Sequence, residues 1–151
     1  FKEFFMKITK KIVCLILLVL TTFPSKAGAS GSPSQRTSYD WTRVINAIIE
    51  VESEGDAKAV SGNSCGAMQI TPILVKECNE ILEKLGKKKR YTLKDRFSIA
   101  KSKEMFLLIQ KHSNPENNVE KAIRRWNGGP RYSVRHTQKY YNKVMKAMRH
   151  Q

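Results

Sequence analysis

Glu52 is a carboxylate that the sequence places on a hydrophobic face. An apolar stripe with helical spacing precedes it and consists of Trp41, Val44, Ile45, Ile48 and Ile49. The next turn of that stripe reaches Glu52. Because desolvation disfavours an ionised carboxylate, a buried glutamate needs a hydrogen-bond donor or has its pKa raised toward neutrality. A raised pKa is what a general acid requires. The alternative is a position at the edge of the stripe, with Ser53 or a lysine as a structural partner.

The segment from Cys65 to Ile70 is apolar except for one glycine and one amide. It follows Ser61-Gly62-Asn63-Ser64, a sequence typical of a turn. Gly66 permits a close approach of the backbone, and the side chain of Gln69 both donates and accepts hydrogen bonds. These properties predict one wall of a cleft.

The sequence Trp126-Asn127-Gly128-Gly129-Pro130 predicts an abrupt helix end, because Asn and Gly tolerate positive φ. An exposed aromatic ring beside an amide is a common sugar-binding surface, since the ring covers C–H groups and the amide pairs with hydroxyls. The alternative is a helix terminator with a core tryptophan. This segment alone leaves both open.

Taken in order, these segments resemble the signature of the soluble lytic transglycosylase family. The matching residues are Glu52-Ser53, Ala59-Val60-Ser61, Gly66-Ala67-Met68-Gln69-Ile70-Thr71-Pro72, Trp126-Asn127-Gly128-Gly129-Pro130 and Tyr140. The family usually has tyrosine where this chain has Trp126, which keeps an aromatic ring but loses a hydroxyl. The resemblance covers most of the chain after residue 40 and implies a lysozyme-like fold.

The resemblance implies one catalytic acid/base, Glu52, and no cofactor or metal. The substrate would be the glycan strands of peptidoglycan. Glu52 would protonate the β-1,4 glycosidic oxygen between N-acetylmuramic acid and N-acetylglucosamine, then accept the proton of the muramoyl 6-hydroxyl as a 1,6-anhydro ring closes. The implied substrate-binding residues are Ser53, Gly66, Met68, Gln69, Trp126, Asn127 and Tyr140.

Other functions stay open. Glycoside hydrolysis generally uses two carboxylates, and of the neighbours Glu50, Glu54 and Asp56 none is well placed. A lysozyme-type muramidase would still use one, such as Asp56. A non-catalytic cell-wall-binding module is a further alternative. Nucleic acid is not expected, because most aromatic residues lie on helical apolar stripes. A secretion or conjugation apparatus is a candidate partner of what we expect to be a monomer.

Helices must position these residues, and the sequence predicts a mainly α fold, a single lysozyme-like helical domain with little or no sheet. The first helix starts near Asp40, which is placed to cap it. A second begins at Thr71-Pro72 and ends at Gly86, with Leu74, Cys78, Ile81, Leu82 and Leu85 inward. A third helix is expected at Ser98–His112, with Ile99 partly inward. A fourth would run from Asn114-Pro115 to Trp126, and a last helix would carry the residues from Tyr140 to Met148.

The N-terminal residues predict export. Lys7, Lys10 and Lys11 precede an apolar run and a small-residue site ending at Ala29, as in a secretory signal peptide of residues 1–29. Met6 would be the initiator. Residues 30–38 would be a flexible leader and residues 39–151 the domain. The predicted location is periplasmic or associated with the cell envelope.

The sequence is strongly basic. From residue 30 it has 23 basic and 12 acidic residues, a net charge of +11. Such charge attracts nucleic acid, anionic lipid head groups or an anionic wall polymer, and charge alone does not choose among them. The run Lys87-Lys88-Lys89-Arg90 is interpreted as a solvated face.

Cysteine and histidine supply no predicted chemistry. Cys65 and Cys78 are either a disulfide or two buried thiols. The three histidines are scattered without metal-ligand spacing, so we expect no metal site. The sequence also has no Gly-rich phosphate loop, which argues against nucleotide hydrolysis.

Overall fold

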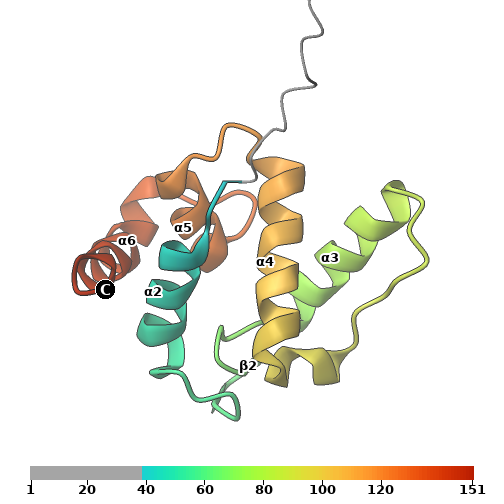
Figure 1. Cartoon of the computed structure of the whole chain (residues 1–151), viewed down its shortest axis with the longest axis horizontal. Helices are drawn as coiled ribbons and strands as arrows, with labels where there is room; N and C mark the ends of the chain where they lie inside the picture. Colours follow the sequence, from blue (N-terminus) through green and yellow to red (C-terminus); the bar gives the residue numbers. More distant parts are fainter. Residues whose placement is uncertain (1–38) are drawn as a thin grey trace, which may run out of the picture. The chain divides into compact units, whose positions relative to one another are not determined.

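The computed structural model describes residues 39–151, so the predicted signal peptide and leader lie outside the described part. Between residues 39 and 151 there are five α-helices, one 3-10 helix and one two-stranded hairpin (Figure 1). In chain order they are α2 (Thr42–Ser53), β1 (Val60–Ser61), β2 (Ser64–Cys65), α3 (Pro72–Lys84), η1 (Leu93–Phe97), α4 (Ile99–Ser113), α5 (Val119–Gly128) and α6 (Val134–Arg149). The mainly α fold with very little sheet is confirmed.

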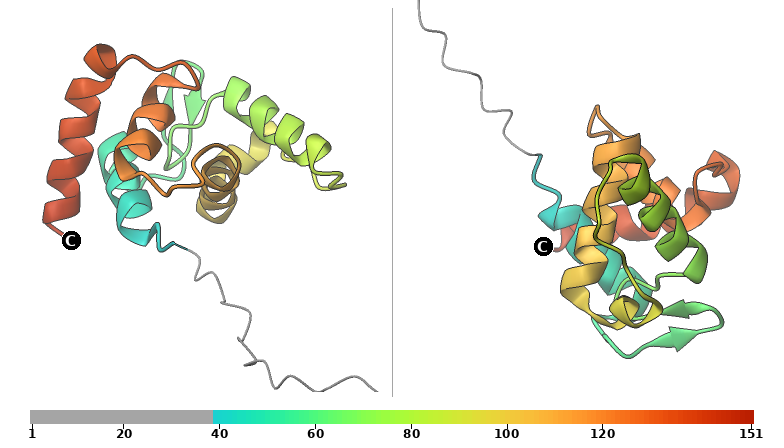
Figure 2. Two further views of the ribbon diagram at one scale, coloured as in Figure 1. Left: turned by 90° about the horizontal axis from the view of Figure 1, so that it is seen from above. Right: turned by 90° about the vertical axis from the view of Figure 1, so that its right-hand side faces the viewer.

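The core is centred on α4, which lies between α3 on one side and α2 with α5 on the other (Figures 1 and 2). Phe106 of α4 is fully buried, and the rings of Trp41 and Trp126 pack against it with centroid distances of 5.6 and 5.4 Å. Helices α2 and α5 both pack against α6. All members of this hydrophobic cluster come from residues 41–147, within a compact unit of residues 38–151. This part therefore contains the core that it needs to fold by itself.

Helix starts follow the sequence closely. The hydroxyl of Thr71 accepts a hydrogen bond from the backbone N–H of Leu74 at 3.2 Å, and Pro72 opens α3 as predicted. Asp40 accepts from the N–H of Thr42, the first residue of α2, at 2.9 Å, although the N-cap position itself is Trp41, whose side chain makes no capping hydrogen bond. The inward prediction for Leu85 is wrong, because Leu85 ends α3 and is 51% exposed. Ile99, also predicted to face partly inward, is exposed in the first turn of α4.

The predicted start of the next helix at Asn114 is wrong. Asn114 ends α4 instead, and its buried side chain accepts from the N–H of Asn118 at 3.0 Å and donates to Gln110 and to the Asn118 carbonyl. Asn118 then caps α5 by accepting from the N–H of Lys121 at 2.9 Å. Both asparagines could cap a helix. Asn118 is the cap of α5 because its side chain reaches the N–H of Lys121 in the first turn, whereas the side chain of Asn114 bonds to Asn118.

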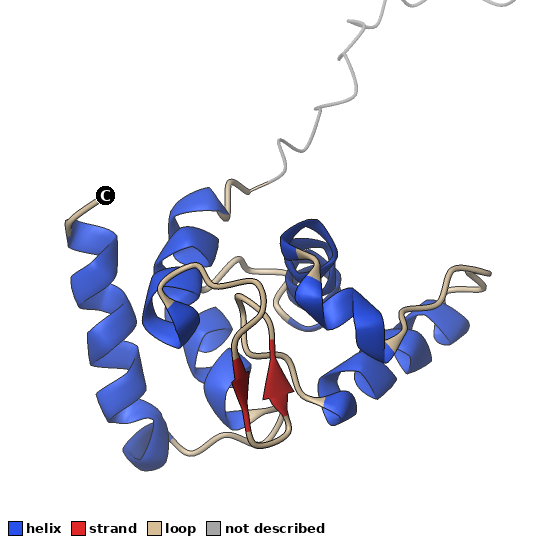
Figure 3. Ribbon diagram, turned by 90° about the horizontal axis from the view of Figure 1, so that it is seen from below, coloured by secondary structure: helices blue, strands red, loops and turns tan. Residues whose placement is uncertain are grey.

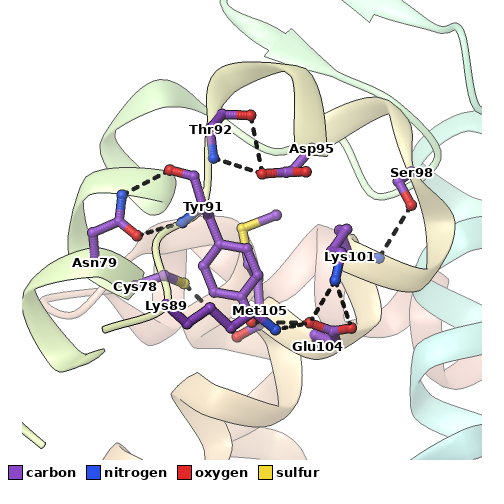
Figure 4. Close-up of polar contacts among 10 residues, drawn as sticks. All are labelled: Cys78, Asn79, Lys89, Tyr91, Thr92, Asp95, Ser98, Lys101, Glu104 and Met105. Carbon is purple, nitrogen blue, oxygen red and sulfur yellow. Dashed lines mark hydrogen bonds and ion pairs between the residues drawn. The ribbon is translucent and has the colours of Figure 1, made fainter. Parts of the chain in front are cut away.

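The connection between α3 and α4 is fastened to both helices (Figure 4). Asn79 and Tyr91 exchange two hydrogen bonds, of 2.9 and 2.7 Å. Glu104 pairs with Lys89 and Lys101 and accepts from the Tyr91 hydroxyl. All four residues from Lys87 to Arg90 are exposed, so the interpretation of this run as a solvated face is confirmed, and Lys89 also lies over the Tyr91 ring. These contacts hold η1 in place.

Gly66 lies where η1 meets the hairpin. Its φ of +77° belongs to the left-handed region, and a Cβ there would lie 1.8 Å from the carbonyl oxygen of Arg96. The predicted close approach of the backbone at Gly66 is confirmed, and the approaching segment is η1. None of the helices between residues 39 and 151 is long and apolar enough to cross a membrane.

Gly66→Ala is expected to lower the free energy of unfolding by about 2–5 kcal/mol, because left-handed strain and overpacking both apply. The matched control is Gly62→Ala, at φ +57° with open space around the added methyl. That variant should lose only the strain contribution, about 1–2 kcal/mol. Urea unfolding of both measures the difference, and equal losses would contradict the proposed clash with Arg96.

Candidate functional site

Glu52 lies in the last turn of α2 and is partly buried. Its Oε1 accepts a hydrogen bond from the hydroxyl of Tyr140 on α6 at 2.7 Å. Burial raises the pKa of the Glu52 carboxyl, and the hydrogen bond from Tyr140 counteracts part of that increase. Within the described residues no hydrogen bond engages Oε2 of Glu52. One carboxyl oxygen is thus oriented by the protein, and the other is available for chemistry.

Tyr140 acts only as a donor in this pair. Burial raises the pKa of its phenol, and the negative charge of Glu52 and the hydrogen bond to it raise that pKa further. The phenol therefore keeps its proton whichever state Glu52 adopts. A neutral donor at a fixed position stabilises the ionised form of Glu52 more than the protonated form, since a hydrogen bond to a charged acceptor is the stronger one.

Ser53 ties the end of α2 to the segment that follows the hairpin. Its hydroxyl donates to the carbonyl of Ala67 at 2.9 Å and lies 3.5 Å from the carbonyl of Ile49. The donor capacity of Ser53 is therefore used within the protein. Any contact of Ser53 with a sugar would have to use a lone pair of this hydroxyl.

Gln69 follows Met68 in a left-handed conformation, with φ of 46°. Its Nε2 donates to the carbonyls of Gly66 at 3.0 Å and Ala59 at 3.3 Å. Both amide hydrogens are thus turned toward the hairpin. Among residues 39–151 no donor engages Oε1 of Gln69, which leaves this oxygen free to accept from a ligand.

Trp126 is only 8% exposed, and its indole N–H donates to the carbonyl of Met68 at 3.2 Å. Of the two interpretations of this segment, the core tryptophan is the correct one. The helix also continues to Gly128, and the chain turns at Gly129, whose φ is 74°. Met68 is fully buried, so its side chain lies behind the surface. Asn127 is exposed next to Trp126.

A pocket of about 130 Å³ opens beside these residues. It is bounded by Gln69, Trp126 and Asn127 together with Thr71 and Ile73, while Glu52 and Tyr140 are not part of its wall. The site residues therefore form two groups, the Glu52–Tyr140 pair and the pocket. The segment from Gly66 to Ile70 joins them, because Ser53 bonds to Ala67 and Trp126 bonds to Met68.

The pocket also contains an ion pair that the sequence did not indicate. Arg125 of α5 pairs with Glu77 of α3, and the Nε of Arg125 is buried without a hydrogen-bond partner in the described part of the chain. Forty-eight residues separate the two. Periodicity links residues of one helix only, so no signal in the sequence joins them.

Among residues 39–151, no second carboxylate makes a hydrogen bond to Glu52 or to Tyr140. Asp56 accepts from the N–H of Lys58 at 2.7 Å, and so holds the turn after α2. Glu50 and Glu54 line a different groove, beside Lys143 and Lys146 of α6. The arrangement offers one acid and one neutral donor.

Cys65 and Cys78 are buried free thiols and form no disulfide, so the second of the two predicted alternatives is the one found. Cys78 faces α4, where its thiol lies 3.9 Å from the carbonyl of Met105, and burial raises its pKa to about 12. Such a thiol stays protonated and unreactive at neutral pH. Residues 39–151 contain no cluster of three or more metal-ligating side chains.

The raised pKa of Glu52 predicts a pH-dependent stability difference between the wild type and Glu52→Gln. The folded state binds this proton more tightly than the unfolded state, in which the pKa is near 4.5. The wild type should therefore lose stability as the pH rises from about 4.5 through the raised pKa, and the variant should not. Urea unfolding across this range measures the difference. A difference that is constant with pH would contradict it.

The model of the transglycosylase SLT domain family matches residues 33–148. No curated protein and no solved structure matches the chain. The family implies a lytic transglycosylase-type activity on peptidoglycan in the cell envelope, although it also includes members without catalysis. Because the match spans most of the sequence and all of the site residues described above, the chain belongs to the transglycosylase SLT domain family.

Proposed function

We propose that this domain is a peptidoglycan lytic transglycosylase in which Glu52 is the single catalytic acid/base. The observation that carries the proposal is the partly buried carboxyl of Glu52, with a raised pKa and one oxygen held by Tyr140. A raised pKa keeps more of the carboxyl protonated near neutral pH, which a general acid needs.

In the first step Glu52 donates its proton to the glycosidic oxygen between N-acetylmuramic acid and N-acetylglucosamine. The bond from that oxygen to C1 breaks, and positive charge develops at C1 of the muramoyl residue. Glu52 becomes a carboxylate at this point. The hydroxyl of Tyr140, 2.7 Å from Oε1, then stabilises the negative charge that has formed.

In the second step the carboxylate of Glu52 takes the proton of the muramoyl 6-hydroxyl, and O6 forms a bond to C1. The proton that Glu52 gave up is replaced, and the product carries a 1,6-anhydro ring. Water is not consumed. The engagement of other carboxylates supports this course: Asp56 holds a turn and Glu77 is paired with Arg125. A hydrolase of the two-carboxylate type needs a second carboxylate to activate water or attack C1.

The sugar chain would pass from Glu52 toward the pocket beside Gln69. Oε1 of Gln69 and the exposed amide of Asn127 are suited to pair with sugar hydroxyls, and the edge of Trp126 offers apolar surface. Gly66, Met68 and Ser53 would act indirectly, since their contacts fix the segment that carries Gln69. We also propose export through the N-terminal 29 residues. A secretion or conjugation apparatus as partner, and a monomeric state, stay predictions.

The reaction is tested by mass spectrometry of peptidoglycan digested with residues 38–151, comparing wild type with Glu52→Gln and a matched control, Glu50→Gln. We expect anhydromuramoyl products from wild type and control, and a rate about 10²–10⁴-fold lower for Glu52→Gln, the usual contribution of a general acid. Products about 18 mass units heavier, with a reducing end, would replace the transglycosylase with a hydrolase. Near-normal turnover by Glu52→Gln would overturn the assignment of the acid.

Tyr140→Phe removes the donor to Glu52 and should move the pH profile. Without the hydrogen bond that favours the carboxylate, the pKa of Glu52 rises further, so the alkaline decline of kcat/KM should shift to higher pH. The rate at the optimum should fall about tenfold to a hundredfold, as for loss of a hydrogen bond to a charged group. Tyr141→Phe is the control, because the ring of Tyr141 packs under Arg124. An unshifted profile for Tyr140→Phe would rule out this role.

A further inference from the structure

Charge is distributed unevenly along the described chain. Residues 39–120 contain 13 basic and 12 acidic residues, so this part is almost neutral. Residues 121–151 contain nine basic residues and no acidic residue. Nearly the whole net charge of the domain therefore comes from its last 31 residues. A general excess of surface lysine would have been spread over both parts.

Two of these nine cations are already neutralised within the fold. Arg124 pairs with Glu120 and Arg125 with Glu77. The cations of α6 itself have no ion pair among residues 39–151, and all are exposed: Arg135, Lys139, Lys143, Lys146 and Arg149.

The five cations occupy one side of α6. Helical spacing puts them opposite the buried side, which carries Thr137, Val144 and Ala147. At 1.5 Å per residue the row extends over about 20 Å. Helix α6 forms one edge of the part that the structure describes, and none of the other helices and strands of residues 39–151 covers its outer side (Figures 2 and 3). Glu50 and Glu54 of α2 share a groove with Lys143 and Lys146 at one rim of the row.

This shape fits a broad anionic surface better than a single polymer strand. The row runs along the outer side of α6, and the groove that it borders at Lys143 and Lys146 is also lined by Glu50 and Glu54, which would repel an anionic strand. Its outer side carries no aromatic residue on which bases could stack, because Tyr140 and Tyr141 are partly buried on the other side. The apolar side of α6 is packed in the core, so attraction would be electrostatic, without insertion.

We propose that the outer face of α6, the basic face formed by Arg135, Lys139, Lys143, Lys146 and Arg149, docks the domain on a membrane surface rich in anionic phospholipid. Each lysine or arginine at such a surface strengthens binding about fivefold. Tyr140 projects from the opposite side of the same helix, so Glu52 would be about one helix diameter, 10–12 Å, from the lipid head groups. The domain would then act on glycan strands close to the membrane.

The test is binding of residues 38–151 to phosphatidylglycerol vesicles and to neutral phosphatidylcholine vesicles, measured by co-sedimentation. The variant is the triple substitution Lys139→Gln, Lys143→Gln and Lys146→Gln. The matched control removes the same charge elsewhere, with Lys87→Gln, Lys88→Gln and Lys94→Gln, three exposed lysines outside α6. Thermal unfolding of each variant checks that the fold is kept. The assay needs no enzymatic activity, so its result is independent of the proposed reaction.

We expect binding to phosphatidylglycerol only, weakened by added salt, about 100-fold weaker for the α6 variant and within a few fold of wild type for the control. Equal losses in the two variants would mean that net charge alone acts, and would overturn the proposal. So would no binding to anionic vesicles. Release from the vesicles by a short oligonucleotide at equal phosphate concentration would assign the basic face to nucleic acid instead and would also overturn it.

Discussion

The hydrogen bond from Tyr140 to Glu52 is the contact on which the site depends. It joins residues 88 positions apart, so it exists only if α6 returns along α2 in one register. A partly buried carboxylate without a donor would carry the full desolvation cost. One with several donors would have a low pKa and would be ionised at neutral pH, with no proton to donate to a leaving group. A single neutral phenol lies between these limits. It reduces the cost of the charge and leaves the pKa of Glu52 raised.

The register of α6 is set by Arg124, which is almost completely buried. Its guanidinium donates to Glu120 in its own helix and, across the turn, to the carbonyl of Val134, to Thr137 and to Gln138, and it lies 4.4 Å from the centre of the Tyr141 ring. A planar fork with five donors can satisfy this many acceptors at fixed angles, which an ammonium group cannot. Gly128 allows the close contact, since a Cβ there would lie 2.6 Å from Tyr132 and 2.8 Å from Thr137.

Much of this structure follows from local sequence rules, and the site does so only in part. Periodicity locates α2 and places Glu52 at its inner edge, and Thr71-Pro72 fixes the start of α3, because capping and amphipathicity involve residues within two turns. Tyr140 was identified through the family resemblance and not through any spacing. The Glu77–Arg125 pair and the burial of Trp126 could not be predicted, since each depends on which helices meet. The start of α5 was misplaced because Asn114 and Asn118 are equivalent as caps until the turn between them is known.

The two sides of α6 impose opposite electrostatic requirements. The last 31 residues carry nine positive charges. Cations near Glu52 would favour its ionised form and lower its pKa, so that Glu52 would have no proton to donate at neutral pH. Burial is the main cause of the raised pKa of Glu52, and the hydrogen bond from Tyr140 opposes it. Helical geometry keeps most of this charge on the outside, because α6 turns Tyr140 toward Glu52, while Lys143 and Lys146 at the rim of the basic face lie beside Glu50 and Glu54. The proposed docking of the basic face would act through solvent, where salt screens charge over about 8–10 Å, and Glu50 and Glu54 offset part of the charge at its rim.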